Sequence, residues 1–222
     1  MKFFEFEQLA AALLQEDRGA LPNLYIYGPP GTSKTYFLNE LISKLKLPIM
    51  GYSFVPSTGT YESSRGRAAH WRELIGDREV RIWWLTFHQG ISYEDFVLGL
   101  RPIPEGAGLK LQPRAGPLLE AAEWAKSGGA SFIFIDEMNR GDLPRILGDF
   151  ITFMEYGNRL KEDGRGDGIL PLTFANLNRD DSTPRISEKI IFQSGEETID
   201  LVDGGYKIPR HLYILGTMNS LD

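Results

Sequence analysis

Leu24-Tyr25-Ile26-Tyr27-Gly28-Pro29-Pro30-Gly31-Thr32-Ser33-Lys34-Thr35 is the stretch that decides the fold. Its first four residues are aliphatic or aromatic and predict a short strand, which must stop at the glycines and prolines that follow. Apolar residues then recur with helical spacing at Phe37, Leu38, Leu41, Ile42 and Leu45. Glycine permits backbone angles that turn successive N–H groups toward an anion, and a helix N-terminus adds a positive dipole. The stretch therefore predicts a strand, a phosphate-binding loop and a helix.

The predicted loop supplies most of the candidate nucleotide ligands. They are Gly28, Pro29, Pro30, Gly31, Thr32, Ser33, Lys34 and Thr35. Lys34 is expected to reach the β- and γ-phosphates, and the Thr35 hydroxyl to bind Mg²⁺. The usual loop has glycine before the lysine, whereas this sequence has Ser33. The alternative is a Gly/Pro turn followed by a chance Lys-Thr pair, but the flanking strand and helix favour the phosphate loop.

Strands and helices alternate along the rest of the chain. A continuous apolar run predicts a buried strand at Val80–Phe87, and a second such run follows at Phe132–Ile135. Three helices and a hairpin are expected between or after them. The first helix is capped by Ser92, carries Phe96, Val97 and Leu100, and ends at Arg101-Pro102. The other helices are at Pro117–Lys126 and Leu143–Tyr156, and the hairpin is around Ile190–Val202. The last expected strand is His211–Thr217. This order predicts an α/β fold with a mainly parallel sheet, in which ligands bind at the carboxyl ends of the strands.

Polar residues stand at two of these strand ends. Asp136 and Glu137 follow the Phe132–Ile135 run, and Asn219 follows the last strand. Asp136 is expected to hold Mg²⁺, Glu137 to act as general base on the attacking water, and Asn219 to orient that water. Taken singly, the acids also suit a helix N-terminus and the asparagine a turn. The order of the three motifs favours catalysis, with Lys34, Glu137 and Asn219 as catalytic residues.

Several segments together resemble McrB-like proteins of the dynein-related and MoxR-like AAA+ branch. The segments are Gly28 to Thr35, Thr86-Phe87-His88-Gln89, Ser92-Tyr93-Glu94-Asp95-Phe96, Gly99-Leu100-Arg101-Pro102, Gly116-Pro117-Leu118, Ile135-Asp136-Glu137-Met138-Asn139-Arg140-Gly141 and Gly216-Thr217-Met218-Asn219-Ser220-Leu221-Asp222. In the family, the acid pair is a Walker B motif and Asn219 occupies the sensor 1 position. The Met-Asn-x-x-Asp pattern at 218–222 has been compared with a guanine-reading element, so the resemblance implies GTP or ATP as substrate. Arg140 is left open between a neighbouring subunit's phosphate and a structural ion pair.

The resemblance also implies an architecture and partners. It implies a P-loop NTPase AAA+ three-layer sandwich, a hexameric ring in the full-length protein, and a McrC-like nuclease subunit. AAA+ proteins continue past sensor 1 into an arginine finger, a fifth strand and a helical lid. We therefore expect residues 1–222 to be an incomplete core that lacks the C-terminal lid and carries an exposed insert at about 161–202. DNA contact is expected to be indirect or through a missing domain.

Composition limits the remaining function classes. The 222 residues are 42% hydrophobic, which suits one folded domain. The chain has no cysteine, so disulfides and thiolate metal sites are excluded. The net charge of −6 argues against a free-standing duplex-DNA binder. No apolar stretch reaches the roughly 20 residues of a membrane-spanning helix, so we expect a cytoplasmic protein without membrane contact.

The leading hypothesis is a Mg²⁺-dependent NTPase motor that drives DNA translocation by an associated nuclease in a McrBC-type restriction system that recognises modified DNA. One alternative is a MoxR-like ATPase that remodels a protein partner. Another is a nucleotide-binding scaffold that oligomerises without turnover. Hydrolysis by the isolated polypeptide is expected to be weak.

Overall fold

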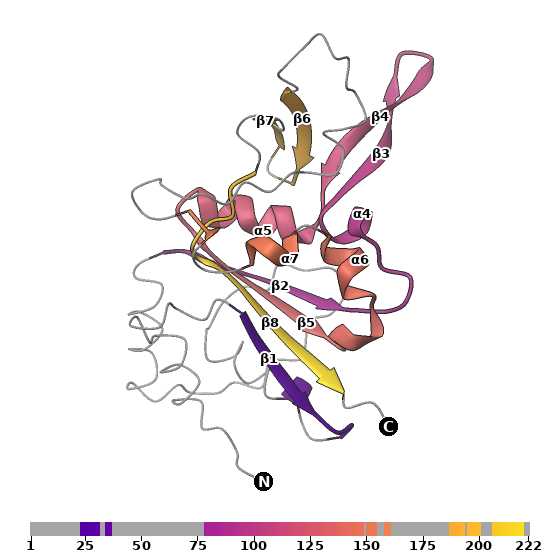
Figure 1. The fold of residues 1–222 in the computed structure, drawn as a ribbon. Helices are drawn as coiled ribbons and strands as arrows, with labels where there is room; N and C mark the ends of the chain where they lie inside the picture. The colour runs from indigo at the N-terminus through magenta and orange to yellow at the C-terminus, as the bar shows by residue number, and fades with distance from the viewer. Residues whose placement is uncertain are drawn as a thin grey trace.

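A four-stranded parallel sheet forms the base of the molecule in the computed structural model (Figure 1). The structure describes residues 23–31, 34–36, 78–148, 150–154, 158–160, 187–193, 195–200 and 206–219. The strands of this first sheet are β1 (Asn23–Gly28), β2 (Val80–Thr86), β5 (Ala130–Asp136) and β8 (Leu212–Asn219). Their order in space is β1-β8-β5-β2, and each neighbouring pair is parallel. The fold is therefore α/β with a mainly parallel sheet, consistent with a P-loop NTPase.

The two central strands, β5 and β8, are buried because both of their faces are apolar. Phe132, Ile133 and Phe134 on β5 are each 0% exposed. Side chains alternate between the faces, so Ile133 joins the main core while Phe132 stacks on Tyr213 of β8, with ring centroids 4.8 Å apart. An apolar run without alternation is the pattern of a strand covered on both sides.

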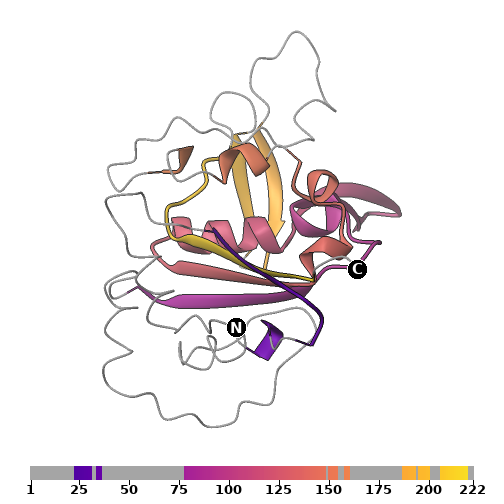
Figure 2. The ribbon, with the colours of Figure 1, turned by 60° about the horizontal axis from the view of Figure 1, so that its bottom comes forward.

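Helix α5 (Pro117–Lys126) lies across one face of the sheet (Figure 2). It begins at Pro117, where the missing N–H and fixed φ of proline suit the first helical turn, and its Leu118 and Leu119 are fully buried. The other helices of the described chain are short. They are α4 (Tyr93–Phe96), the 3-10 turn η2 (Met138–Arg140), α6 (Leu143–Leu147) and α7 (Phe150–Phe153), and residues 34–36 are also helical.

A second sheet stands on the other side of α5 from the first (Figures 1 and 2). Its strands are β3 (Leu98–Glu105), β4 (Gly108–Ala115), β6 (Ser187–Phe192) and β7 (Gly195–Asp200), in the order β3-β4-β6-β7. Two antiparallel hairpins, β3–β4 and β6–β7, meet through a single parallel pair, Arg114 and Ile191. The distal part of β3–β4 projects from the body of the molecule (Figure 1).

The helix expected from Ser92 to Arg101-Pro102 is wrong beyond its first turn. Helix α4 ends at Phe96, and Leu100 lies on β3. The chain turns at Val97, and β3 then passes so close to α4 that a Cβ on Gly99 would come within 2.4 Å of the Glu94 carbonyl oxygen. The apolar spacing of Phe96, Val97 and Leu100 is compatible with a helix, but the turn at Val97 and the close approach at Gly99 override it.

The single helix expected at Leu143–Tyr156 is also wrong. The chain forms α6 and α7 instead, and Gly148 between them has φ +54°. This backbone conformation favours glycine and interrupts a right-handed helix. Apolar periodicity continued across the break, which is why the sequence pattern did not reveal it.

The remaining expected elements are confirmed where the structure describes them. These are the strands at Val80–Phe87, Phe132–Ile135 and His211–Thr217, the helix at Pro117–Lys126 and a hairpin near Ile190–Val202, each within a few residues of its expected bounds. The helix expected to carry Phe37 to Leu45 lies outside the described residues, as does the stretch 161–183 of the expected insert. Ile190 and Phe192, on the described part of that insert, are buried. No helix in the described part of the chain is long and apolar enough to cross a membrane.

Candidate functional site

The carboxyl ends of β1, β8 and β5 lie side by side at one edge of the first sheet. Gly28 at the end of β1 is in register with Asn219 at the end of β8, and Ile135 on β5 is in register with Gly216 on β8. The parallel arrangement therefore brings the loop after β1, the acids after β5 and the polar end of β8 to one place. Residues separated by more than 180 positions in the sequence become neighbours.

The Thr35 side chain makes direct contact with Asp136. Its hydroxyl oxygen lies 3.2 Å from each carboxylate oxygen of Asp136, so the start of the helix after the loop is joined to the end of β5. Lys34 is 9% exposed, and its ammonium donates to the carbonyl oxygens of Gly28 at 2.9 Å and Pro29 at 2.7 Å. Gly31 has φ +76°, a conformation that glycine adopts without steric cost.

A single hydroxyl on β8 connects the two acids. Thr217 is 2% exposed, and its Oγ1 donates to Oδ1 of Asp136 in a short hydrogen bond. The same oxygen accepts the backbone N–H of Glu137 at 3.1 Å. Thr217 therefore fixes the Asp136 carboxylate and the backbone of the following residue at once.

Both carboxylate oxygens of Glu137 accept hydrogen bonds. Oε1 accepts from Nδ2 of Asn219 at 2.6 Å, and Oε2 accepts from Nε of Arg140 at 2.9 Å. The Glu137 backbone is left-handed, with φ +57° and ψ +42°. This conformation costs a non-glycine residue roughly 1–2 kcal/mol, so the surrounding structure must hold it in place.

The end of β8 is also attached to the 3-10 turn after the acids. Asn139 donates through Nδ2 to the Asn219 carbonyl oxygen at 3.1 Å, and its Oδ1 accepts the Asn219 N–H at 3.2 Å. Two hydrogen bonds from one amide fix both the position and the direction of the β8 end. Close packing reinforces this, because a Cβ on Gly216 would lie 1.9 Å from Sδ of Met138.

The donor set at this edge fits a magnesium-bound phosphate. Mg²⁺ is usually held by one or two protein oxygens and completes its shell with water and phosphate oxygens. The Thr35 hydroxyl and the Asp136 carboxylate are adjacent oxygens of this kind, and the Lys34 ammonium is the matching cation for a phosphate. Among the residues that the structure describes, no group of three or more His, Asp or Glu side chains is placed to hold a metal alone. The Thr35 and Asp136 oxygens with the Lys34 ammonium fit Mg²⁺ shared with phosphate.

Most of the predicted site residues are brought together. Lys34, Thr35 and Asp136 with Glu137 and Asn219 form one connected cluster, and Gly28 to Gly31 lead into it. Thr32 and Ser33 lie outside the described residues. The contributions of Thr217 and Asn139 were not predicted from the sequence. Thr217 stands two residues before Asn219 on the same strand, so the period of two places both side chains on one face, and this was the available signal.

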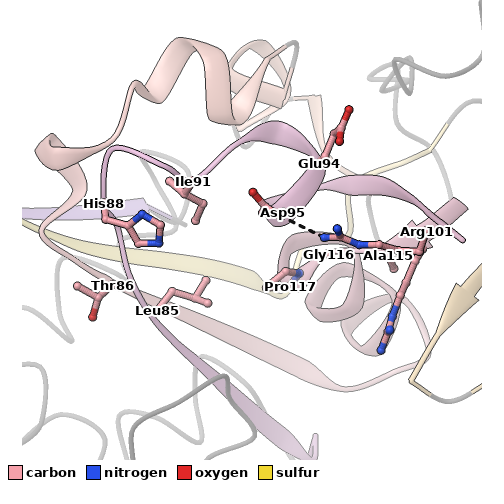
Figure 3. A pocket seen from close by; sticks show the side chains of 11 residues that line it. Leu85, Thr86, His88, Ile91, Glu94, Asp95, Arg101, Ala115, Gly116 and Pro117 are labelled. Atoms are coloured by element: carbon pink, nitrogen blue, oxygen red, sulfur yellow. Dashed lines mark hydrogen bonds and ion pairs between the residues drawn. The ribbon is translucent and has the colours of Figure 1, made fainter.

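A pocket of about 500 Å³ lies beside this cluster (Figure 3). It extends from the end of β2 at Thr86, which is in register with Asp136, to the base of the β3–β4 hairpin. Arg101 and Arg114 line the hairpin side, and His88 lines the opposite side, where its Nδ1 accepts the Gly90 N–H at 3.1 Å. Lys34, Asp136, Glu137 and Asn219 do not line this pocket, so we place the candidate site at the strand ends.

Asp95 connects α4 to the hairpin at the wall of the pocket. Its carboxylate accepts from the Ser92 hydroxyl at 2.8 Å and from Nη2 of Arg101 at 3.2 Å. The Ser92 hydroxyl, with smaller contributions from Arg101 and the Ser92 N–H, holds the pKa of Asp95 below its usual value. The carboxylate is therefore ionised at neutral pH and keeps Arg101 in place.

Sequence comparison connects this geometry to a known protein. The Type IV methyl-directed restriction enzyme EcoKMcrB subunit of Escherichia coli (strain K12) is 26% identical over 204 residues, or 90% of this chain. The similarity supports a McrB-like family relationship. This chain spans 31% of the length of that relative. No protein-family model matches this chain.

Proposed function

We propose that this chain is the nucleotide-binding and hydrolysing core of a McrB-like AAA+ subunit in a modification-dependent restriction system. The observation that carries the proposal is the connected cluster at the strand ends, in which Thr35 contacts Asp136 and Asn219 contacts Glu137. A phosphate-binding lysine, a metal-binding pair and a general base with its orienting amide are the parts that phosphoryl transfer to water requires. The similarity to the restriction subunit supports the biological setting.

Each residue has a defined part in the proposed reaction. Lys34 binds the β- and γ-phosphates, and Thr35 and Asp136 hold Mg²⁺, which neutralises charge that develops on the phosphates. Glu137 accepts a proton from the attacking water, and Asn219 holds that water in line with the phosphorus. Thr217 and Asn139 are positioning residues, because they act on the acids and on Asn219 rather than on substrate.

Arg140 gives this cluster a means of control. Its guanidinium donates to Oε2 of Glu137 while Asn219 donates to Oε1, so an attacking water would compete with both donors for the carboxylate oxygens. The Arg140 side chain is 64% exposed, so it is free to leave Glu137 for another anion. The sequence left two roles open for Arg140, and the ion pair with Glu137 is the one present in this structure. If Arg140 moved instead to a neighbouring subunit's phosphate, Glu137 would lose this hydrogen bond.

The finer features of the proposal rest on the family relationship. They are GTP or ATP as substrate, Mg²⁺ as cofactor, a hexameric ring, a McrC-like nuclease partner and indirect engagement of DNA. The catalytic set proposed above comes from this chain's own side chains and does not depend on which purine is bound.

Separate titrations of GTP and ATP, each with Mg²⁺, test the proposal. We expect wild-type protein to bind at least one nucleotide and to release phosphate. Glu137→Gln should retain binding but lose turnover by about 100-fold or more, since the amide cannot accept the proton. Glu123→Gln, a change of the same kind on α5 away from the strand ends, is the matched control and should keep its turnover.

The outcomes separate the rival functions. Binding without turnover in the wild type would favour a non-hydrolysing scaffold. Turnover that does not respond to DNA or to a McrC-like nuclease would favour a remodelling ATPase of the MoxR type. Failure of the wild type to bind either Mg-nucleotide would remove the proposal altogether.

A further inference from the structure

The pocket of about 500 Å³ lies where the first sheet, helix α5 and the second sheet meet (Figure 3). Its walls come from the end of β2, the loop that follows, α4, the base of the β3–β4 hairpin and the start of α5. The strand-end cluster contributes none of the side chains that line it. A volume of this size holds a small organic molecule. The pocket is therefore a candidate site for a second ligand.

Backbone hydrogen bonds and close packing hold the walls of the pocket in place. The Ile91 N–H donates to the His88 carbonyl oxygen at 3.1 Å, and the Gly116 N–H donates to the Val97 carbonyl oxygen at 2.8 Å. A Cβ on Gly116 would lie 2.5 Å from the Phe96 backbone, so the residue after β4 is in direct contact with the end of α4. A ligand would therefore meet a preformed surface, which lowers the entropic cost of binding.

Arg114 gives the pocket a cation that the described part of the chain does not neutralise. Its cross-strand partners are Gly99 on β3, which has no side chain, and Ile191 on β6, which is apolar. Arg114 makes no hydrogen bond or ion pair with any residue that the structure describes. The guanidinium of Arg101, by contrast, is already paired with the Asp95 carboxylate at 3.2 Å. Arg114 is therefore the cation available to an anionic ligand.

His88 supplies a hydrogen-bond donor on the side of the pocket opposite the hairpin (Figure 3). Its Nδ1 accepts the Gly90 N–H at 3.1 Å, so the proton of the neutral imidazole lies on Nε2. This Nε2–H has no acceptor among the described residues. Leu85, Ile91 and Pro117 add apolar surface to the same pocket. The lining thus offers a cation, a neutral donor and an apolar wall.

The acids of the pocket limit the charge of its ligand. Glu94 and Asp95 line the pocket together with Arg101 and Arg114, so two acids match two cations. A dianion would meet one unpaired guanidinium and the repulsion of both acids. A carboxylate carries a single charge and matches a guanidinium with two parallel hydrogen bonds. The lining therefore favours a carboxylate over a doubly charged phosphate ester.

We propose that this pocket binds a small amphipathic carboxylate, which has a carboxylate at one end, an apolar body and a hydrogen-bond acceptor at the other end. Arg114 binds the carboxylate, and the Nε2–H of His88 donates to the acceptor. Leu85, Ile91 and Pro117 contact the apolar body. This site is separate from the nucleotide cluster, and its occupancy does not depend on nucleotide hydrolysis.

Titration with para-acetylbenzoate tests the proposal, because this rigid molecule carries a carboxylate and a ketone at opposite ends of one ring. Isothermal titration calorimetry of the full chain, without nucleotide, measures the affinity. We expect saturable binding by the wild type and binding about tenfold or more weaker by Arg114→Gln, which loses a charged hydrogen-bond donor. Lys110→Gln is the matched control, since it makes the same loss of charge on β4 outside the pocket, and it should bind as the wild type does.

A second series isolates the contact to His88. Benzoate lacks the ketone, so His88→Phe should weaken binding of para-acetylbenzoate several-fold and leave the affinity for benzoate unchanged. Nitrogen–proton correlation spectra of the imidazoles provide an independent measurement. The Nε2 signal of His88 should shift with para-acetylbenzoate more than with benzoate. Equal effects of His88→Phe on both molecules would overturn the role of His88 in the proposal.

Glu94→Gln separates a binding effect from damage to the fold. This variant removes a like charge from the lining, so it should bind para-acetylbenzoate more tightly than the wild type, a gain that misfolding cannot produce. Phenyl phosphate tests the preference for a single charge. Tighter binding of phenyl phosphate than of benzoate would show that the pocket prefers a dianion, and the assignment of a carboxylate would fail.

The proposal is overturned if the wild type shows no saturable binding of para-acetylbenzoate at millimolar concentrations, or if Arg114→Gln and the wild type bind it equally. Both results are independent of the nucleotide site. A chain that binds para-acetylbenzoate but neither Mg-nucleotide would retain this inference and lose the proposed function. A chain that binds a Mg-nucleotide but not para-acetylbenzoate would do the reverse.

Discussion

The two sheets of this molecule are built in opposite ways. The first sheet is parallel, has apolar side chains on both faces of β5, and carries its polar residues at the carboxyl ends of the strands. The second consists of two antiparallel hairpins joined through one residue pair, with exposed leucines on β4. The first sheet buries its strands and concentrates chemistry at one edge, whereas the second exposes its strands and distributes charge across them. The candidate chemistry is thus concentrated on the first sheet.

The largest expected difference is in nucleotide affinity. Lys34→Ala should weaken Mg-nucleotide binding about 100-fold, because a cation next to the phosphates is lost. Lys110→Ala, the same change on the second sheet, should leave the affinity within about twofold, since β4 does not contribute to the strand-end cluster. Isothermal titration calorimetry measures both. Equal losses of nucleotide affinity in the two variants would contradict the placement of the nucleotide site on the first sheet.

The next test concerns Gly116, which connects β4 of the second sheet to helix α5. Gly116→Ala places a Cβ 2.5 Å from the backbone of Phe96, which has no means of moving away cheaply. We expect the free energy of unfolding to fall by about 3 kcal/mol. Gly108→Ala at the hairpin tip is the matched control, because the nearest atom to its Cβ is 3.8 Å away. Urea denaturation measures the stability of both variants. Equal midpoints would show that the space between Gly116 and the Phe96 backbone is not as tight as described.

A smaller effect is expected from the left-handed backbone of Glu137. Glu137→Gly and Glu137→Ala both lose the contacts to Asn219 and Arg140, so the comparison isolates the backbone. The glycine variant should be more stable by about 1 kcal/mol, since alanine retains the steric cost at φ +57°. Thermal unfolding of the pair provides the measurement. An alanine variant as stable as the glycine variant would show that no strain is stored there.

The smallest effect concerns Asp95 between α4 and the hairpin. Its pKa is lowered in the folded protein, chiefly by the Ser92 hydroxyl, from a reference value of 3.8. A depressed carboxylate pKa stabilises the fold above the unfolded value, and this contribution is lost as the pH falls through the folded pKa. Asp95→Asn should therefore lower the melting temperature slightly at pH 7, and the difference from wild type should vanish in strong acid. A difference that is constant with pH would exclude this origin.

The sequence predicted the first sheet well because burial on both faces leaves a continuous apolar run, as in Phe132 to Ile135. It also predicted which residues meet, since parallel strands align their carboxyl ends. Half of the second sheet was predicted, as the hairpin near Ile190–Val202, but the strands β3 and β4 were not. Pro102 and Pro104 argue locally against a strand, and they are tolerated here because β3 lies at an edge. Thr217 was missed for a different reason: its spacing of two from Asn219 places both side chains on one face of β8, but that spacing does not show that the hydroxyl contacts the acids.

The position of β8 has a consequence for how the protein matures. This strand lies between β1 and β5 in space, yet it is the last described element in the chain. During synthesis, the loop after β1 and the acids after β5 emerge from the ribosome long before their common neighbour. The phosphate cradle and its acids therefore have no shared framework until β8 inserts, and a nascent chain lacking this strand should neither retain nucleotide nor consume it.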